Sequence, residues 1–92
     1  MADVVVTLNI MPETPDSDLS RIEKESLALI KKFAGIDNHK TEIKPVAFGL
    51  KMISIMFVMP ESKGSTEELE EKIKNINEVS NVEVADVRRT VG

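Results

Sequence analysis

The feature that most constrains this 92-residue chain is its most apolar stretch, Leu-Lys-Met-Ile-Ser-Ile-Met-Phe-Val-Met at positions 50–59. A strand that is apolar at nearly every position is expected to pair with neighbours on both edges and to be covered on at least one face. The rest of the chain must supply those neighbours and that cover. The stretch therefore predicts a layered fold built around one central strand.

Three further segments predict strands. Residues 3–11 alternate apolar and polar side chains, which predicts a strand with one drier face. Residues 39–46 are more polar, and Pro45 within them cannot donate a ladder hydrogen bond, which favours a position at the edge of a sheet. Residues 79–89 form the last strand, and their alternation slips at 84–85, which indicates a bulge.

Two segments predict amphipathic helices. Between positions 19 and 33 apolar side chains recur every three or four residues, after possible N-caps at 16–18 and before Gly35, a natural left-handed terminator. These signals predict a helix of about 17 residues. The second helix follows Ser-Thr-Glu-Glu, which predicts a capping box in which Ser65 caps and Glu68 returns the bond.

The resulting order is β-α-β-β-α-β, which predicts an α+β fold of the ferredoxin-like kind. Right-handed crossovers place the first and third strands in the centre of a four-stranded sheet of order 4-1-3-2. Both helices then cover one face, and the other face is open to solvent or to a partner. At this length the chain is expected to form a single domain over residues 1–92.

Composition removes several classes of function. The chain has no cysteine, which excludes disulfides, thiolate metal sites and cysteine nucleophiles. A formal net charge of −4 argues against nonspecific nucleic-acid binding, which depends on basic side chains that neutralise phosphates, but leaves room for a local basic patch. No direct contact with nucleic acid is expected. No apolar run approaches the roughly 20 residues of a membrane span, and the first residues do not form a signal peptide. We therefore expect a cytoplasmic protein with no membrane contact, cofactor or metal.

Two patterns that could imitate sites have simpler interpretations. His39 is the only histidine and has no serine or carboxylate partner recognisable by spacing, so it is predicted to be a surface residue of a strand. The glutamates within 67–71 are predicted to form the solvated face of a capped helix and not a set of metal ligands.

Two other features are not explained by folding. Phe48-Gly49 predicts a tight turn with one of only three aromatic side chains near its tip. Phe48 could fold back over an edge of the core or contact a partner. Arg88-Arg89 could be a solvated strand end, with Asp86 bridging to either arginine, or a site for carboxylate or phosphate.

Four segments, at 3–6, 11–13, 45–50 and 84–89, include a Pro-x-Ala-Phe-Gly motif and an Asp-Val-x-Arg ending, which are specific as a combination. In their order and spacing, over essentially the whole chain, these segments resemble the archaeal elongation factor 1-beta family. The resemblance implies a ferredoxin-like guanine nucleotide exchange factor, not itself an enzyme. Its implied partner is elongation factor 1-alpha, the GTPase that delivers aminoacyl-tRNA to the ribosome.

The resemblance also implies roles for particular residues. Eukaryotic relatives use a lysine near the C-terminus that intrudes toward the magnesium site of the GTPase, and this position is Arg89 here. They use the aromatic of the Phe-Gly turn at the GTPase surface, which corresponds to Phe48. The implied partner-binding set is Pro45, Phe48, Gly49, Arg88 and Arg89, with Arg89 as the residue that disturbs the nucleotide site. The free protein is expected to be a monomer.

A different class of function stays open at this point. A noncatalytic regulatory or small-molecule-binding module of the same fold would dimerise through its sheet and would have no effect on a GTPase. A glycine-rich ligand loop would favour that alternative, but the four glycines are scattered along the chain.

Overall fold

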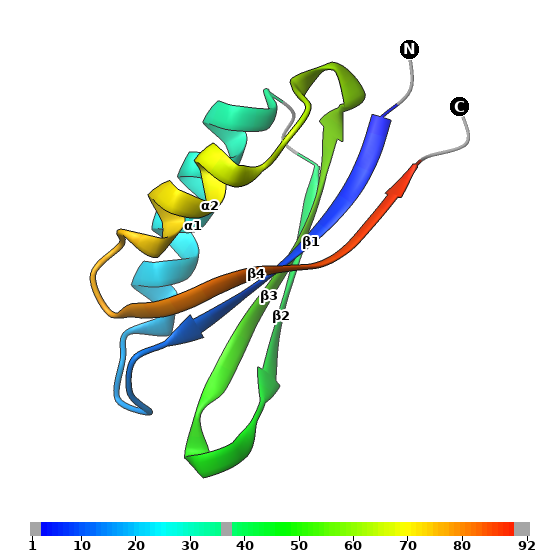
Figure 1. Cartoon of the computed structure of the whole chain (residues 1–92). Coiled ribbons are helices and arrows are strands. Elements are labelled where there is room, and N and C mark those ends of the chain that lie inside the picture. Colours follow the sequence, from blue (N-terminus) through cyan, green and yellow to red (C-terminus); the bar gives the residue numbers. More distant parts are fainter. Residues whose placement is uncertain (1–2, 36–37, 90–92) are drawn as a thin grey trace.

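The computed structural model describes residues 3–35 and 38–89; the remaining residues of the predicted 1–92 domain lie outside the described part. Four antiparallel strands form one sheet in the order β2-β3-β1-β4. Both helices lie on the same face of this sheet (Figure 1). This arrangement confirms the predicted α+β, ferredoxin-like fold and its strand order. The elements are β1 (Asp3–Pro12), α1 (Leu19–Ala34), β2 (His39–Pro45), β3 (Lys51–Pro60), α2 (Glu67–Lys74) and β4 (Val79–Arg89), with 3-10 turns at Ala47–Gly49 and Glu61–Lys63.

The apolar stretch forms the centre of the sheet, as predicted. β3 pairs with β2 along one edge and with β1 along the other. The alternate side chains of β3 that face the helices are fully buried, together with three of their four cross-strand partners on β1; the fourth, Val4, is partly buried. Burial of these side chains against α1 and α2 is the main source of stability in a chain of this size. The buried side chains of the two strands are Ile53, Ile55, Phe57, Met59, Val6, Leu8 and Ile10.

The ends of α1 follow the predicted signals. The side chain of Asp18 accepts a hydrogen bond of 3.1 Å from the backbone N–H of Arg21. At the other end, Gly35 adopts a left-handed conformation with φ of 71°, and its N–H donates to the carbonyl of Lys31 over 2.9 Å. A residue without a Cβ carries that conformation at little cost.

The capping box predicted for α2 is wrong. The N-cap is Thr66, one residue later than expected, and its side chain makes no capping hydrogen bond. With Thr66 as cap, the position that should return the bond is occupied by Leu69, which has no acceptor. The Ser65 hydroxyl instead accepts from the N–H of Glu67 at 3.1 Å, and Thr66 donates to the Glu70 carboxylate at 2.7 Å.

An arginine that the sequence did not single out joins the start of α1 to the loop before β4. Arg21 donates to the carboxylates of Glu78 and Glu25, each at 2.6 Å, and to the carbonyl of Asn77 at 2.8 Å. The hydrogen bond with Glu78, and then the one with Glu25, raises the pKa of Arg21 above its ordinary value. This cluster connects two segments that are far apart in the sequence.

Within the described residues, neither helix is long and apolar enough to cross a membrane.

Candidate functional site

The turn between β2 and β3 presents Phe48 to solvent. The turn is closed by two backbone hydrogen bonds, from the N–H of Val46 to the carbonyl of Leu50 at 2.9 Å and from the N–H of Leu50 to the carbonyl of Ala47 at 3.3 Å. Phe48 is 94% exposed at the tip. Its aromatic ring therefore does not fold back over the core, which removes one of the two interpretations of this residue.

The backbone of Phe48 is also strained. It has φ of 63° and ψ of 29°, and the following Gly49 has φ of 75°. A left-handed conformation costs glycine little, but it costs a residue with a Cβ about 1 kcal/mol. An exposed aromatic side chain in such a backbone gains nothing for the fold that would offset this cost. Strain of this kind is found most often at sites that bind or catalyse.

We expect Phe48→Gly to stabilise the free protein by about 0.5–1 kcal/mol, because glycine relieves the left-handed backbone and the exposed ring contributes no burial. Chemical denaturation of the two proteins measures the difference. The matched variant Gly49→Ala should be destabilised by a similar amount, since it places a Cβ at a φ of 75°. A loss of stability in Phe48→Gly would mean that the ring packs against the protein.

The second candidate group lies at the end of β4. The β1–β4 register pairs Thr7 with Asp86 but Leu8 with Val84, so Ala85 is unpaired and forms the predicted bulge. Beyond the bulge, Arg88 lies opposite Val5 and Arg89 opposite Val4. Because neighbouring side chains point to opposite faces of a sheet, the bulge determines which arginine faces which way.

The two arginines therefore have different surroundings. Arg88 projects on the open face of the sheet and pairs with Asp86 at 2.7 Å, one of the bridges that the sequence allowed. Arg89 shares the helix side with Val4 and forms an ion pair with Glu61 in the turn after β3. Both arginine side chains are more than two-thirds exposed, so each carboxylate holds its partner weakly and both arginines are accessible to another protein.

Sequence reasoning missed Glu61. The segment at 60–64 was expected only to be a loop. The signal lies in the register: Pro60 is opposite Asp3, and Val4 is opposite Arg89, so the residue after Pro60 must lie beside the end of β4. That placement follows only once the strand order and pairing are known.

The structure gathers the predicted residues at two places and not at one. Pro45, Phe48 and Gly49 lie around the β2–β3 turn, and Arg88 and Arg89 lie at the opposite end of the sheet (Figure 1). The ten residues of β3 that separate the two ends span about 30 Å at roughly 3.3 Å per residue. No single small ligand can touch both groups.

The other residues weighed from the sequence show no sign of a site. His39 is an exposed residue of β2, as predicted, and the glutamates of α2 lie on its solvated side. Among residues 3–35 and 38–89 there is no cluster of His, Asp and Glu side chains that could hold a metal ion. These observations leave the two ends of the sheet as the candidate site.

Comparison with known proteins identifies the family. The EF-1 guanine nucleotide exchange domain matches residues 5–90. Elongation factor 1-beta of Methanothermobacter thermautotrophicus is 45% identical over 89 residues, covering 97% of this chain and 98% of that protein. The chain belongs to the elongation factor 1-beta family. This family is that of a guanine nucleotide exchange domain, which confirms the predicted exchange-factor function and does not favour the noncatalytic, dimerising module.

Other elongation factor 1-beta proteins match over the same length of the chain at somewhat lower identity. Elongation factor 1-beta of Methanobrevibacter smithii is 39% identical and that of Methanosarcina barkeri is 37% identical, each covering 97% of this chain and at least 98% of the relative. A solved structure described as the de novo designed protein Foldit4 superposes with a TM-score of 0.57 at 21% identity, over 98% of each chain. That likeness concerns the fold alone.

Proposed function

We propose that this member of the elongation factor 1-beta family acts on elongation factor 1-alpha through two contacts at opposite ends of its sheet. Phe48 anchors one end on the GTPase, and Arg89 acts at the other end on the magnesium and phosphate site. The observation that carries this proposal is that Phe48 has a strained backbone and is 94% exposed, so that its ring contributes nothing to its own fold. Large aromatic side chains are frequent anchors of protein interfaces.

The role of Arg89 follows from the chemistry of the nucleotide site. A GTPase holds GDP through a phosphate-binding loop and a magnesium ion that neutralise the phosphate charge. A guanidinium placed nearby competes with the magnesium ion for the same negative charge. Arg89 is exposed and forms an ion pair with Glu61, and it can exchange that carboxylate for an anionic group of the GTPase.

The separation of the two ends gives the two contacts different roles. At about 30 Å they must touch different parts of the GTPase surface, with Phe48 and its turn residues Pro45 and Gly49 providing affinity and Arg89 acting on the nucleotide site. Arg88, on the open face, contributes to binding. The rigid sheet between the two ends fixes their spacing, so that the anchored turn orients the arginine.

Exchange then follows from thermodynamic coupling. If the factor binds the nucleotide-free GTPase more tightly than the GDP-bound form, it weakens GDP binding by the same ratio. The factor itself catalyses no covalent step and is not an enzyme. It needs no cofactor, acts as a single domain over residues 1–92, is a monomer when free, works in the cytoplasm and makes no direct nucleic-acid contact.

The test is release of a fluorescent GDP analogue from elongation factor 1-alpha, followed by stopped flow. Substoichiometric amounts of the wild-type factor are expected to accelerate release, because each molecule is regenerated. We expect Phe48→Ala to raise the factor concentration needed for half-maximal acceleration by about tenfold or more, as for a typical anchor residue. The variant should remain folded. Ile43→Ala removes an apolar side chain from the exposed part of β2. This control should accelerate GDP release from the GTPase as much as the wild-type factor does. Equal behaviour of Phe48→Ala and wild type would refute the anchor.

A further inference from the structure

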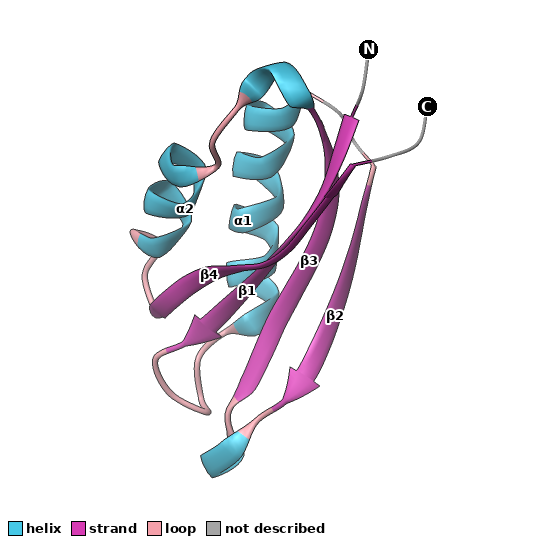
Figure 2. Cartoon of the chain, turned by 45° about the vertical axis from the view of Figure 1, so that its right-hand side comes forward, coloured by secondary structure: helices cyan, strands magenta, loops and turns pink. Residues whose placement is uncertain are grey.

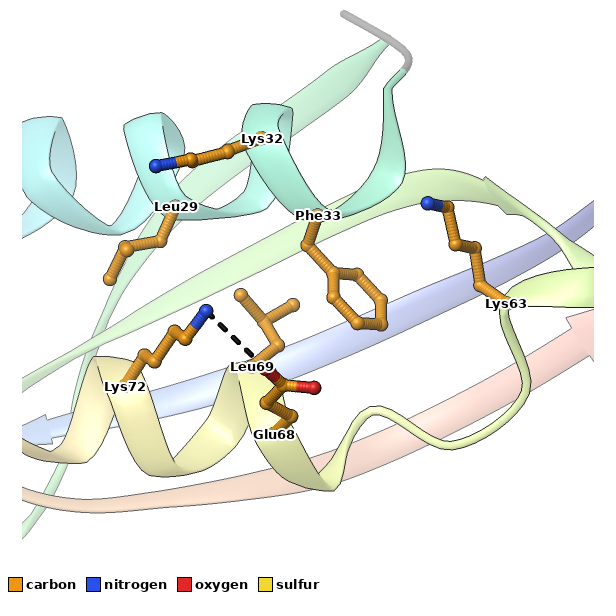
Figure 3. A pocket seen from close by; sticks show the side chains of 7 residues that line it. All are labelled: Leu29, Lys32, Phe33, Lys63, Glu68, Leu69 and Lys72. Carbon is orange, nitrogen blue, oxygen red and sulfur yellow. Dashed lines mark ion pairs between the residues drawn. The ribbon is translucent and has the colours of Figure 1, made fainter.

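A groove between the two helices is not used by the proposed exchange mechanism. It encloses about 410 Å³ between the C-terminal half of α1, the start of α2 and the turn after β3. Figure 3 shows the apolar side chains of Leu29, Phe33 and Leu69 pointing toward one another between the helices, with lysines around them. The two helices themselves lie side by side on the sheet (Figure 2). The complete lining is Leu29, Lys32, Phe33, Lys63, Glu68, Leu69 and Lys72.

The rim of the groove is positively charged in an acidic protein. Three lysines face one glutamate there, although the whole chain has a formal net charge of −4. Glu68 is engaged by Lys72 at 3.5 Å. Lys32 and Lys63 have no ion-pair partner within residues 3–35 and 38–89. The electrostatic complement of this rim is therefore an anionic group.

The apolar floor of the groove, formed by Leu29, Phe33 and Leu69, favours some anionic ligands over others. Leu29 and Phe33 remain partly exposed although they lie between two helices, so apolar surface is left in contact with water. A free phosphate or a nucleic-acid backbone would satisfy the lysines but would leave this floor uncovered. An acidic peptide with an apolar side chain satisfies both, and a groove between helices is a common place for an amphipathic segment to bind.

We propose that this groove binds an acidic peptide segment of a second partner protein, with an apolar anchor of that segment between Leu29 and Phe33. Carboxylates of the segment then pair with Lys32 and Lys63. None of the lining residues belongs to the Phe48 turn or to the pair Arg88 and Arg89. The groove is thus a docking site for a partner, separate from the residues that act on the GTPase.

The probe is a synthetic peptide in which Asp and Glu flank paired Leu residues, titrated into the isotope-labelled protein and followed by NMR. The amide signals of Leu29, Phe33 and Leu69 are expected to shift, and those around Phe48 to stay in place. The same peptide with Ser in place of Leu should not bind, because the apolar floor then gains nothing. Shifts confined to other surfaces, or equal binding of the Ser peptide, would overturn the proposal.

Charge reversal provides the matched control. We expect the double variant Lys32→Glu/Lys63→Glu to bind the peptide at least about tenfold more weakly, since it loses two ion pairs and gains two repulsions. Lys24→Glu/Lys74→Glu makes the same change in net charge at positions of α1 and α2 that do not line the groove, and it should lose much less. Equal losses in both double variants would show that only overall charge matters. Thermal unfolding checks that each variant is folded.

Two further measurements separate this site from other possibilities. Binding of an RNA oligonucleotide or of anionic vesicles that depends on Lys32 and Lys63, without binding of the acidic peptide, would contradict the proposed occupant. GDP release from the GTPase should be unchanged in Lys32→Glu/Lys63→Glu. Slower release in that variant would place the groove inside the exchange interface and would overturn its assignment to a second partner.

Discussion

Replacing Arg89 with alanine is expected to reduce the acceleration of GDP release by about thirtyfold, the effect of losing an interaction of about 2 kcal/mol. The physical reason is that its neighbour Arg88 lies opposite Val5 and projects to the other face of the sheet, so Arg88 cannot replace the charge of Arg89 on the helix side. Stopped-flow release of the GDP analogue measures the change. Because Arg89 is exposed and buries no core residue, the variant should unfold like the wild type.

Three companion variants sharpen this result. Arg89→Lys keeps the positive charge and should retain most of the acceleration, because the proposed effect on the nucleotide site is electrostatic. Arg88→Ala removes an equal charge from the other face and should lose less than Arg89→Ala. Glu61→Gln frees Arg89 from its carboxylate and should not slow release. A larger loss in Arg88→Ala than in Arg89→Ala would show that the open face, and not the helix side, meets the nucleotide site.

Replacing Phe57 with alanine is expected to cost about 3–5 kcal/mol of the free energy of unfolding, the usual range for deleting a fully buried aromatic side chain. Phe57 is 1% exposed on the central strand and faces the helices. Domains of this kind are stable by only about 5–15 kcal/mol in total, so the loss is a large fraction of the whole. Urea denaturation followed by circular dichroism measures it.

Phe48→Ala is the matched control for that variant. It removes the same ring from a position that is 94% exposed, and the change in stability should stay within about 0.5 kcal/mol. The pair compares a phenylalanine buried in the core with one that is exposed at the tip of a turn. A loss of less than about 1 kcal/mol in Phe57→Ala would contradict the assignment of β3 as the centre of the core.

The fold could be predicted from the sequence because each element carried its own periodicity. The near-continuous apolar run at 50–59 identified the central strand, Pro45 identified an edge, and the slip at 84–85 identified the bulge. The N-cap predicted for α2 was wrong because serine and threonine are both favoured at this position, and the local pattern does not distinguish Ser65 from Thr66.

The site was predictable only residue by residue. The Phe-Gly turn marked a protruding position, but the positive φ of Phe48 beside that of Gly49 has no signal in the sequence. The distance between Phe48 and Arg89 depends on the length of β3 and on the pairing of β4, both of which are properties of the assembled sheet. The pairing of Arg89 with Glu61 follows from the same register and has no local signal.

The most direct test of the account is the rate of GDP release from elongation factor 1-alpha with wild type, Phe48→Ala, Arg89→Ala and the double variant, compared on one concentration series. Contacts at separate, distant places should add in free energy, so the losses of the two single variants should multiply in the double variant. Phe48→Ala should act mainly on the concentration required and Arg89→Ala on the maximal rate. If both single variants accelerated GDP release as fast as the wild-type factor, the claim that a rigid sheet presents two separate contacts to one GTPase would be contradicted.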